Sequence, residues 1–235
     1  IGKDMSTYIT APLALIGGFA IKSAAQFESL KTSLVTSLGG SKEAAAAAFK
    51  EIEKFASSTP FQMEEVTGAF IKLKNMGLDP SMSALESYGN TASSMGKSLN
   101  DMVEAVADAA VGEFERLKEF GIKAKSQGDN VSFTFKGVTT TVKKNSEEIE
   151  QYLQNIGNTE FAGGIEAQSK TFNGVMSTLS DNTAMAAASF GDLMLPVLKR
   201  LSGALASAAE FMRNLTPEAK KIIIVVAGIA AAIGP

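Results

Sequence analysis

Apolar residues recur at helical spacing along most of this chain. Between residues 13 and 38, eight of them follow one another at steps of three and four: Leu13, Ile16, Ala20, Ala24, Phe27, Leu30, Leu34 and Leu38. This spacing places them on one face of a helix, which Gly39-Gly40 should end. We therefore predict a helix within a first, apolar segment, residues 1–40, whose stretch from Ile9 to Ile21 carries no charge.

Shorter helices are predicted next, each from a start signal followed by apolar periodicity. Ser41, Asp79 and Ser98 are polar residues at candidate starts, where a side-chain oxygen can accept a bond from the first turn. The run Thr59-Pro60-Phe61-Gln62 combines an N-cap hydroxyl, a proline at the first helical position and a glutamine at the capping-box position. Gly77 then offers a left-handed helix end.

One β element is predicted. Residues 131–135 and 138–142 are rich in β-branched and aromatic residues, and they flank Lys136-Gly137. A two-residue loop ending in glycine between two such runs predicts a hairpin over about 131–142. In the predicted register, one strand places Val131, Phe133 and Phe135 opposite Val142, Thr140 and Val138 of the other. Two strands are not stable alone, so the apolar face of the hairpin should pack on helices. A helix should start at Asn145 and complete a small helical module over residues 41–160.

Past Gly163-Gly164 the spacing changes to alternating steps of four and three. This spacing predicts a long heptad-patterned helix over 165–215 with one stutter near Pro196, where two steps of four occur in succession. The helix either packs on its own domain or associates with copies of itself, and its length and small residues favour self-association. The predicted oligomer seam consists of Phe172, Met176, Leu179, Ala186, Phe190, Leu193, Val197, Leu201, Ala204, Ala208, Phe211 and Leu215.

The last segment, residues 217–235, predicts the start of a hydrophobic helix. Its 12-residue apolar run, Ile222–Ile233, is shorter than the roughly 20 residues that span a bilayer. The run is therefore either a buried helix or the beginning of a membrane span. Because the chain starts on Ile1 and stops soon after this run, we expect a fragment of a longer protein. The predicted membrane-active residues are Leu13, Leu15, Ile16, Ile222, Ile223, Ile224, Val225, Val226, Ile229 and Ile233.

Composition argues against an enzyme. The chain has no cysteine and no histidine, which excludes disulfides, thiol nucleophiles, the usual zinc sites and Ser-His-Asp chemistry. Glu64-Glu65 and Glu147-Glu148 are expected in first helical turns, where acids favour the helix dipole. Net charge is −3 with signs mixed along the chain, so no sequence-specific nucleic-acid binding is expected. We expect no cofactor and no metal, and a mainly α, extended and oligomeric fold.

Several short landmarks occur in one order along the chain. They are Thr10-Ala11-Pro12-Leu13 with Gly17-Gly18 and Phe27-Glu28, Thr59-Pro60-Phe61 with Glu65-Val66, Leu73 and Gly77, Glu115-Arg116-Leu117 to Gly121-Ile122, Gln168 to Gly174, Leu195-Pro196-Val197-Leu198, Leu215-Thr216-Pro217-Glu218 and Ala232-Ile233-Gly234-Pro235. In this order they resemble the conserved core of bacteriophage tail tape measure proteins, particularly those of phages and prophages of Gram-positive bacteria.

The resemblance implies a protein that is made in the bacterial cytoplasm and lies in the lumen of the virion tail. It would be present in three or six copies, set tail length, leave ahead of the DNA and help the DNA cross the host membrane. The implied partners are further copies of the chain, the tail tube, distal tail or baseplate hub proteins, tail assembly chaperones and, during infection, the host membrane. A long helix suits such a role because its fixed rise per residue can measure distance.

Two other functions share some of these features. A tail-independent, membrane-active helical pore-forming protein would have the same apolar ends, and liposome leakage by a soluble form would favour it. An enzyme such as a cell-wall hydrolase would have to release peptidoglycan by this fragment alone. Tape measure proteins sometimes carry such domains elsewhere in the chain.

Overall fold

The structure is a computed structural model of the 235-residue chain. It describes the backbone of residues 11–214 and the side chains of residues 20–171, 173–189, 191–192, 196, 200, 207 and 210. The chain forms two compact units, one of Ala25–Ala187 and one of Ile1–Ala24 with Ala188–Pro235.

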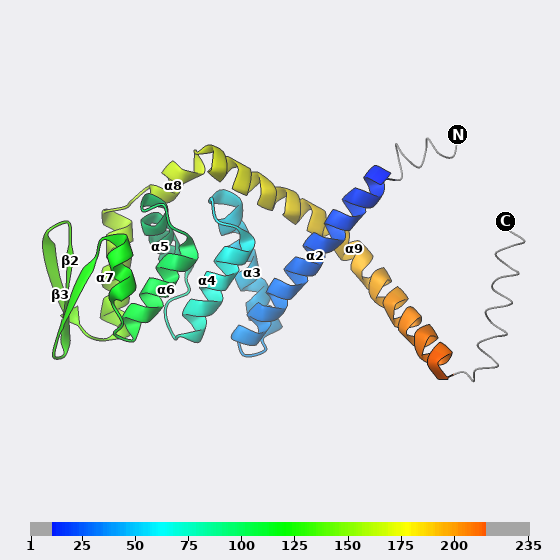
Figure 1. Cartoon of the computed structure of the whole chain (residues 1–235), viewed down its shortest axis with the longest axis horizontal. Coiled ribbons are helices and arrows are strands. Elements are labelled where there is room, and N and C mark those ends of the chain that lie inside the picture. Colours follow the sequence, from blue (N-terminus) through cyan, green and yellow to red (C-terminus); the bar gives the residue numbers. More distant parts are fainter. Residues whose placement is uncertain (1–10, 215–235) are drawn as a thin grey trace, which may run out of the picture. The chain divides into compact units, whose positions relative to one another are not determined.

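The described chain is mainly helical, as predicted. Figure 1 shows its helices, which are α2 (Ala11–Ser37), α3 (Lys42–Ser58), α4 (Met63–Asn75), α5 (Met82–Ser94), α6 (Leu99–Ala110), the 3₁₀ helix η2 (Glu115–Phe120), α7 (Ser146–Thr159), α8 (Gly164–Ser169) and α9 (Phe172–Asn214). The division of the chain into segments 1–40, 41–160, 165–215 and 217–235 stays a prediction.

Three of the predicted helix starts are confirmed. The side chains of Ser41, Ser98 and Asn145 each accept a hydrogen bond from a backbone N–H in the first turn of α3, α6 and α7. Ser98 also forms a reciprocal capping box with Asp101. These short polar side chains satisfy donors that the helix itself cannot pair, which is why the helices begin there.

Two predicted starts are wrong. Thr59 is the C-cap of α3 rather than an N-cap, and α4 begins at Met63 after Gln62, whose side chain makes no capping bond. The next helix is capped by Ser81 instead of Asp79. Asp79 lies two residues earlier, where its carboxylate accepts bonds from the backbone N–H and the hydroxyl of Ser81. In both cases the connection continues for a few more residues before the helix starts.

The hairpin is confirmed in its predicted register and belongs to a larger sheet. The sheet is antiparallel with strand order β1-β2-β3, and the strands are β1 (Lys123–Gln127), β2 (Asn130–Phe135) and β3 (Val138–Lys143). The turn between β2 and β3 has positive φ at Lys136 (47°) and Gly137 (83°), which is a type I′ hairpin turn. Strand β1 was not predicted because residues 123–127 lack an apolar alternation.

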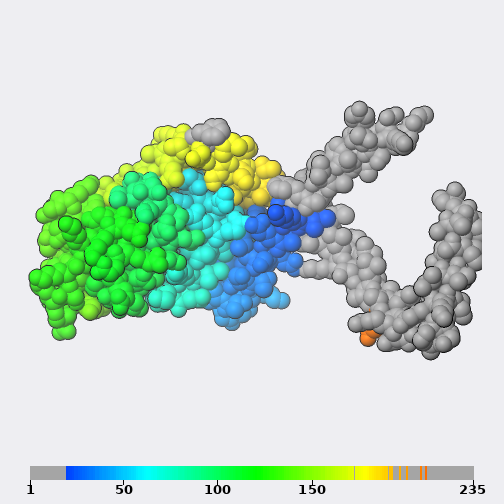
Figure 2. Space-filling view, viewed as in Figure 1, coloured from blue at the N-terminus to red at the C-terminus, as the bar shows by residue number. Residues whose placement is uncertain are grey.

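The apolar face of the hairpin packs on helices, as expected. The Phe133 ring of β2 stacks on Tyr152 of α7, with ring centroids 4.6 Å apart, and Phe114 meets Phe133 edge-on at 5.7 Å. Such pairs add to the stabilisation from burial alone. The space-filling view shows this sheet and the helices α3 to α7 packed as one continuous body (Figure 2).

Helices α5 and α7 approach at a glycine. A Cβ placed on Gly157 of α7 would lie 2.1 Å from the backbone oxygen of Ser87 in α5, so no larger residue fits there without moving a helix. Ser87 also donates from its hydroxyl to the carbonyl oxygen of Gln154 at 2.6 Å. Glycine at this position thus allows the backbones of α5 and α7 to come into direct contact.

In the other unit, the middle of α2 and the middle of α9 also meet at small residues. A Cβ on Gly191 would lie 2.2 Å from the backbone oxygen of Ala20 and 2.6 Å from the Ala24 side chain, which is fully buried. Helix α9 runs through Pro196 without ending, although proline removes one helical hydrogen bond. Its heptad seam and the self-association of the chain stay predictions.

Candidate functional site

The predicted oligomer seam lies on α9. Its members from Phe172 to Phe211 are all helical, and Leu215 lies outside the described residues. Side chains are described for Met176, Leu179 and Ala186. All three are exposed, with Met176 at 46% and Leu179 at 55%. These three seam residues are therefore not used for packing within the residue 25–187 unit.

A third large apolar residue lies beside the seam. Val175 is 54% exposed, and at about 100° per residue it falls on the same side of α9 as Met176 and Leu179. Three large apolar side chains within five residues form a patch that soluble proteins seldom leave uncovered. We call Val175, Met176 and Leu179 the outer face of α9.

The opposite side of α9 holds it to the helical module through polar groups. Ser177 donates to the carbonyl oxygen of Pro60 at 3.0 Å, and Thr178 donates to that of Thr59 at 3.2 Å. Asp181, one turn further, is only 6% exposed. Helix α9 thus turns its hydroxyls and a carboxylate inward and its large apolar residues outward, the reverse of an ordinary surface helix.

Asp181 completes the start of α4. The backbone N–H of Met63 donates to its carboxylate, where the side chain of Gln62 supplies no cap. The other carboxylate oxygen, Oδ2, is buried and has no hydrogen-bond partner among the described residues. Burial, together with the negative charges of Glu64 and Glu65, raises the pKa of Asp181 to about 6. The carboxylate therefore both anchors α9 and carries an electrostatic cost when it is ionised.

Glu65 makes a similar contact to the start of another helix. Its carboxylate accepts a bond from the backbone N–H of Leu99, the first residue of α6, at 2.7 Å. Burial raises the pKa of Glu65, although bonds from backbone N–H groups act in the opposite direction. As predicted, Glu64 and Glu65 lie in the first turn of α4, and Glu147 and Glu148 lie in that of α7.

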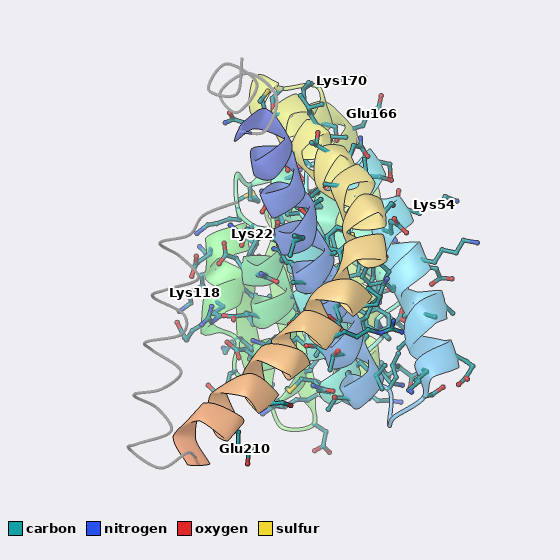
Figure 3. The ribbon with its side chains drawn as sticks, turned by 90° about the vertical axis from the view of Figure 1, so that its right-hand side faces the viewer. Lys22, Lys54, Lys118, Glu166, Lys170 and Glu210 are labelled. Carbon is teal, nitrogen blue, oxygen red and sulfur yellow. The ribbon has the colours of Figure 1, made fainter. Side chains whose placement is uncertain are left out.

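Helix α8 leads the chain into α9 and is tightly held. A Cβ on Gly164 would lie 2.4 Å from the backbone oxygen of Asn90 in α5. The Asn90 side chain accepts a bond from the Ile165 N–H at 3.1 Å. Glu166 and Lys170 pair on the outside at 2.6 Å, side by side in Figure 3. The direction in which α9 begins is thus fixed by backbone contact between α8 and α5.

A buried polar cluster connects α5, on which α8 packs, to α7. Tyr88 is fully buried and donates from its hydroxyl to Glu150 at 3.3 Å, and Glu150 also accepts the Asp79 N–H at 3.1 Å. Burial raises the pKa of both Tyr88 and Glu150. The cluster is a hydrogen-bonded link between α5, α7 and the connection before α5, and it does not open into a cleft.

A charged network covers one side of the helical module. Arg116 pairs with Glu104 at 2.7 Å and with Asp108 at 2.9 Å, and Lys72 pairs with Glu104 at 3.0 Å. These side chains are between about a third and a half exposed, so each pair contributes little to stability. The network joins α4, α6 and η2 and has no feature of a catalytic centre.

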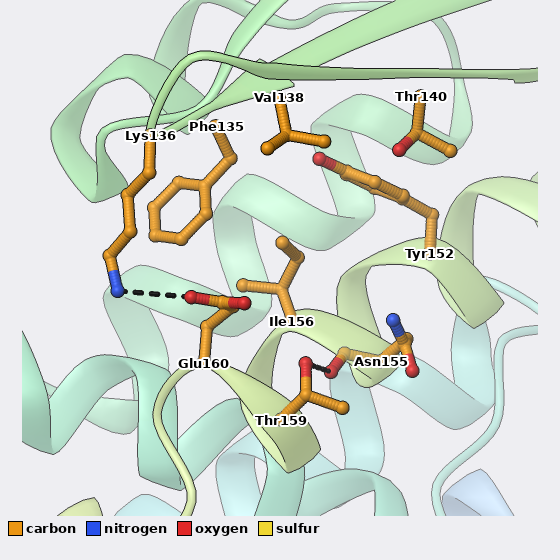
Figure 4. A pocket seen from close by; sticks show the side chains of 9 residues that line it. All are labelled: Phe135, Lys136, Val138, Thr140, Tyr152, Asn155, Ile156, Thr159 and Glu160. Atoms are coloured by element: carbon orange, nitrogen blue, oxygen red, sulfur yellow. Dashed lines mark hydrogen bonds and ion pairs between the residues drawn. The ribbon is translucent and has the colours of Figure 1, made fainter.

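A shallow groove lies between β3 and α7 (Figure 4). One cavity of the groove measures about 210 Å³ and is lined by Phe135, Lys136, Val138, Thr140, Tyr152, Asn155, Ile156, Thr159 and Glu160. A second hollow shares Thr140, Tyr152 and Asn155 and continues to Val142. Lys136 closes one end by pairing with Glu160 at 3.0 Å. The groove is lined by apolar and polar side chains, and its second hollow also includes Glu147 and Glu148 of α7.

Part of the predicted membrane-active set lies in α2, namely Leu13, Leu15 and Ile16. Their side chains are outside the described residues, and so is the whole of residues 222–233. Within the described residues no helix is both long and apolar enough to cross a membrane. Nor do three or more Asp or Glu side chains gather there in a group that could hold a metal ion.

Sequence reasoning missed the inward face of α9. Ser177, Thr178 and Asp181 interrupt the apolar periodicity, and they were not predicted as contacts. A usable signal was present, because the three recur at helical spacing on the side opposite Met176 and Leu179. The hydrogen-bond partners of these side chains could not be predicted, because Thr59 and Pro60 lie more than one hundred residues earlier in the chain.

Comparisons with known proteins agree with the resemblance found in the sequence. A family model described as "Tape measure protein" matches residues 18–192. Over 186 residues the chain is 26% identical to the Mu-like prophage FluMu protein gp42 of Haemophilus influenzae. The match covers 73% of this chain but only 29% of that protein. No solved structure matches the chain.

Proposed function

Because the chain belongs to the tape measure protein family, we propose that it sets tail length from within the tail tube and, on ejection, helps DNA cross the host membrane. A phage tail-related, structural role follows from the family itself. Length determination and DNA delivery are the finer steps that we add. The chain spans 29% of the relative's length, so these activities are proposed for the larger protein to which such a segment belongs.

The proposal rests mainly on the length of α9 and on the side of it that is exposed. It is a continuous helix of 43 residues, about 64 Å long at a rise of about 1.5 Å per residue. Its described seam residues point away from the helical module, whereas its polar side holds the module. A ruler requires a long helix with positions open to neighbours, and α9 offers such positions at Met176, Leu179 and Ala186, the seam residues whose side chains are described.

The outer face of α9 supports self-association within this function. Met176 and Leu179 are exposed at heptad positions, so a second α9 could bury them by knobs-into-holes packing. We propose three or six copies in the tail lumen, in contact with the tube, with distal tail or baseplate hub proteins and, during assembly, with tail assembly chaperones. Residues 222–233 are proposed to act on the host membrane after ejection.

The ruler role is tested by changing the length of α9 in a phage or tail-like particle that carries this chain. An insertion of 21 residues after Arg200, as three heptads that keep the seam in phase, should lengthen tails by about 32 Å. The matched control inserts 21 flexible residues after Gly128, in the turn between β1 and β2, and should leave tail length unchanged. Electron micrographs of purified tails give both lengths. Equal tail lengths in the two variants would refute the role of α9 as a measuring element.

The location of the protein is tested separately. Mass spectrometry of gradient-purified tails should find peptides from residues 41–215 at a few copies per particle. Their absence from intact tails, with the protein free or in membranes, would instead support the tail-independent pore-forming function. This result is independent of tail length, so failure of the ruler role and failure of the tail location are distinguishable.

A further inference from the structure

The two edges of the small sheet differ in their protection. Strands β1 and β3 are both edges, because the strand order is β1-β2-β3. The β1 edge carries Lys123 and Lys125, and charged side chains of this kind discourage pairing with another strand. From Val138 to Val142 the β3 edge has neither charge nor proline, and Val138 is 69% exposed. Between Val138 and Val142 the β3 edge is therefore open to a further strand, whereas the N–H of Lys143 at its end already donates to Glu148.

The backbone groups that β3 offers can be identified from the hairpin. In a two-residue hairpin the residues that flank the turn form a hydrogen-bonded pair, and bonded pairs then alternate along the ladder. The even-numbered residues of β3 therefore bond to β2. Lys144, which is also even-numbered, follows this pattern, because its N–H donates to the Asp129 carbonyl oxygen at 2.8 Å. The N–H and C=O groups of Thr139 and Thr141 consequently point outward from the sheet.

The sequence of the edge reads the same in both directions, Val138-Thr139-Thr140-Thr141-Val142. We propose that this edge pairs antiparallel with β3 of a second copy of the chain, with Thr140 opposite Thr140 of that copy. The pairing places Thr139 opposite Thr141, so the outward backbone groups of one copy meet those of the other. A palindromic edge suits a two-fold antiparallel contact, in which each residue faces a residue of its own kind.

Side chains agree with this register. Val138 and Val142 lie on the groove face of the sheet, and each would lie opposite the other valine of the second copy, on the same face. No charge opposes a like charge between residues 138 and 142, and Lys143 would lie opposite Gly137. The contact is small compared with a stable interface, so we expect a weak pairing that a covalent cross-link can capture. It does not depend on the proposed tape measure role or on the outer face of α9.

The absence of cysteine from the chain makes the register testable. Thr140→Cys introduces a single thiol that faces its own copy in a non-hydrogen-bonded pair, where the Cα atoms lie about 4.5 Å apart, within disulfide range. Mild oxidation of the 235-residue chain should give a covalent dimer on a non-reducing denaturing gel. Ser126→Cys, on the exposed β1 edge, is the matched control and should form at least about fivefold less dimer.

A second variant tests whether the backbone edge makes the contact. Thr139→Pro, combined with Thr140→Cys, removes an outward N–H that the hairpin does not use, and it should reduce the dimer to the level of the control. Unchanged helical circular dichroism and thermal midpoint would show that the module still folds. Equal cross-linking of the Thr140→Cys and Ser126→Cys variants would overturn the proposal and leave the edge for a strand of another protein. Cross-linking that survives Thr139→Pro would overturn it as well.

Discussion

Replacement of Asp181 by asparagine is expected to stabilise the protein at neutral pH and to reduce the pH dependence of its stability. The carboxylate is 6% exposed, and its Oδ2 atom has no hydrogen-bond partner among the described residues. Asparagine keeps an oxygen that can accept the Met63 N–H and carries no charge. Burial raises the pKa of Asp181, and so do the charges of Glu64 and Glu65, which a neutral asparagine would not repel.

The magnitude follows from the pKa. The pKa of Asp181 is about 6 in the folded protein, compared with 3.8 for an ordinary aspartate. The folded state therefore holds the proton more tightly, and the free energy of unfolding falls as pH rises from about 4 to about 6. At about 1.4 kcal/mol per pH unit the loss reaches at most about 3 kcal/mol. It is nearly complete above about pH 6 and small below about pH 4.

Urea unfolding followed by helical circular dichroism at about pH 4 and about pH 7.5 measures this effect. The stability difference between the Asp181→Asn variant and the wild type should be small at the lower pH and grow to between about 1 and about 3 kcal/mol at the higher pH. Taking the difference removes the contribution of Glu150, whose pKa is also raised by burial. Glu65 acts on Asp181 through its charge, so its contribution changes with the substitution and is part of the measured effect. Asp192→Asn, on an exposed position of α9, should change little at either pH. An equal difference at both pH values, or a destabilised Asp181→Asn variant at the higher pH, would refute this account.

Three further predictions concern packing, association and delivery. Gly157→Ala should destabilise the protein by about 2 kcal/mol or more in thermal unfolding, because the added Cβ would lie 2.1 Å from a backbone oxygen. The control Gly68→Ala should be neutral or stabilising, because its Cβ would meet only one side-chain atom, at an ordinary 3.8 Å. Leu179→Lys should weaken self-association in analytical ultracentrifugation, and Asn173→Lys, an exposed control about 120° away from Leu179 around α9, should not; monomers for the wild type would contradict the predicted seam. Ile224→Lys should abolish DNA delivery with tail length unchanged, since a charge in an apolar segment costs about 3 kcal/mol in a membrane, and shortened tails would contradict this separation of roles.

Local signals were sufficient to predict much of the fold. Ser41, Ser98 and Asn145 start helices because a short polar side chain satisfies unpaired N–H groups wherever it occurs. Lys136-Gly137 turns the hairpin because the loop needs positive φ at two successive residues. These are interactions between residues a few positions apart, so the sequence contains both partners. The apolar periodicity of residues 172–215 predicted a helix for the same reason.

Contacts between distant segments could not be predicted in this way. Thr59 looks like an N-cap, yet its carbonyl oxygen accepts a bond from Thr178 on α9. Strand β1 has no apolar alternation of its own and forms because β2 offers it an edge. The pairing of Gly157 with Ser87 across α5 and α7 has no trace in either local sequence.

By itself, the sequence determined the helical class, the hairpin with its register, and the family to which the chain belongs, because periodicity, turn chemistry and ordered landmarks are carried by neighbouring residues. The tertiary structure decided which side of α9 meets the helical module. An apolar seam would ordinarily be buried, but the hydroxyls of Ser177 and Thr178 and the carboxylate of Asp181 find carbonyl and N–H partners at the connection between α3 and α4. Because these bonds hold one side of α9 against the module, Met176 and Leu179 face outward. The bonds can form only because packing brings together segments that are far apart in the sequence.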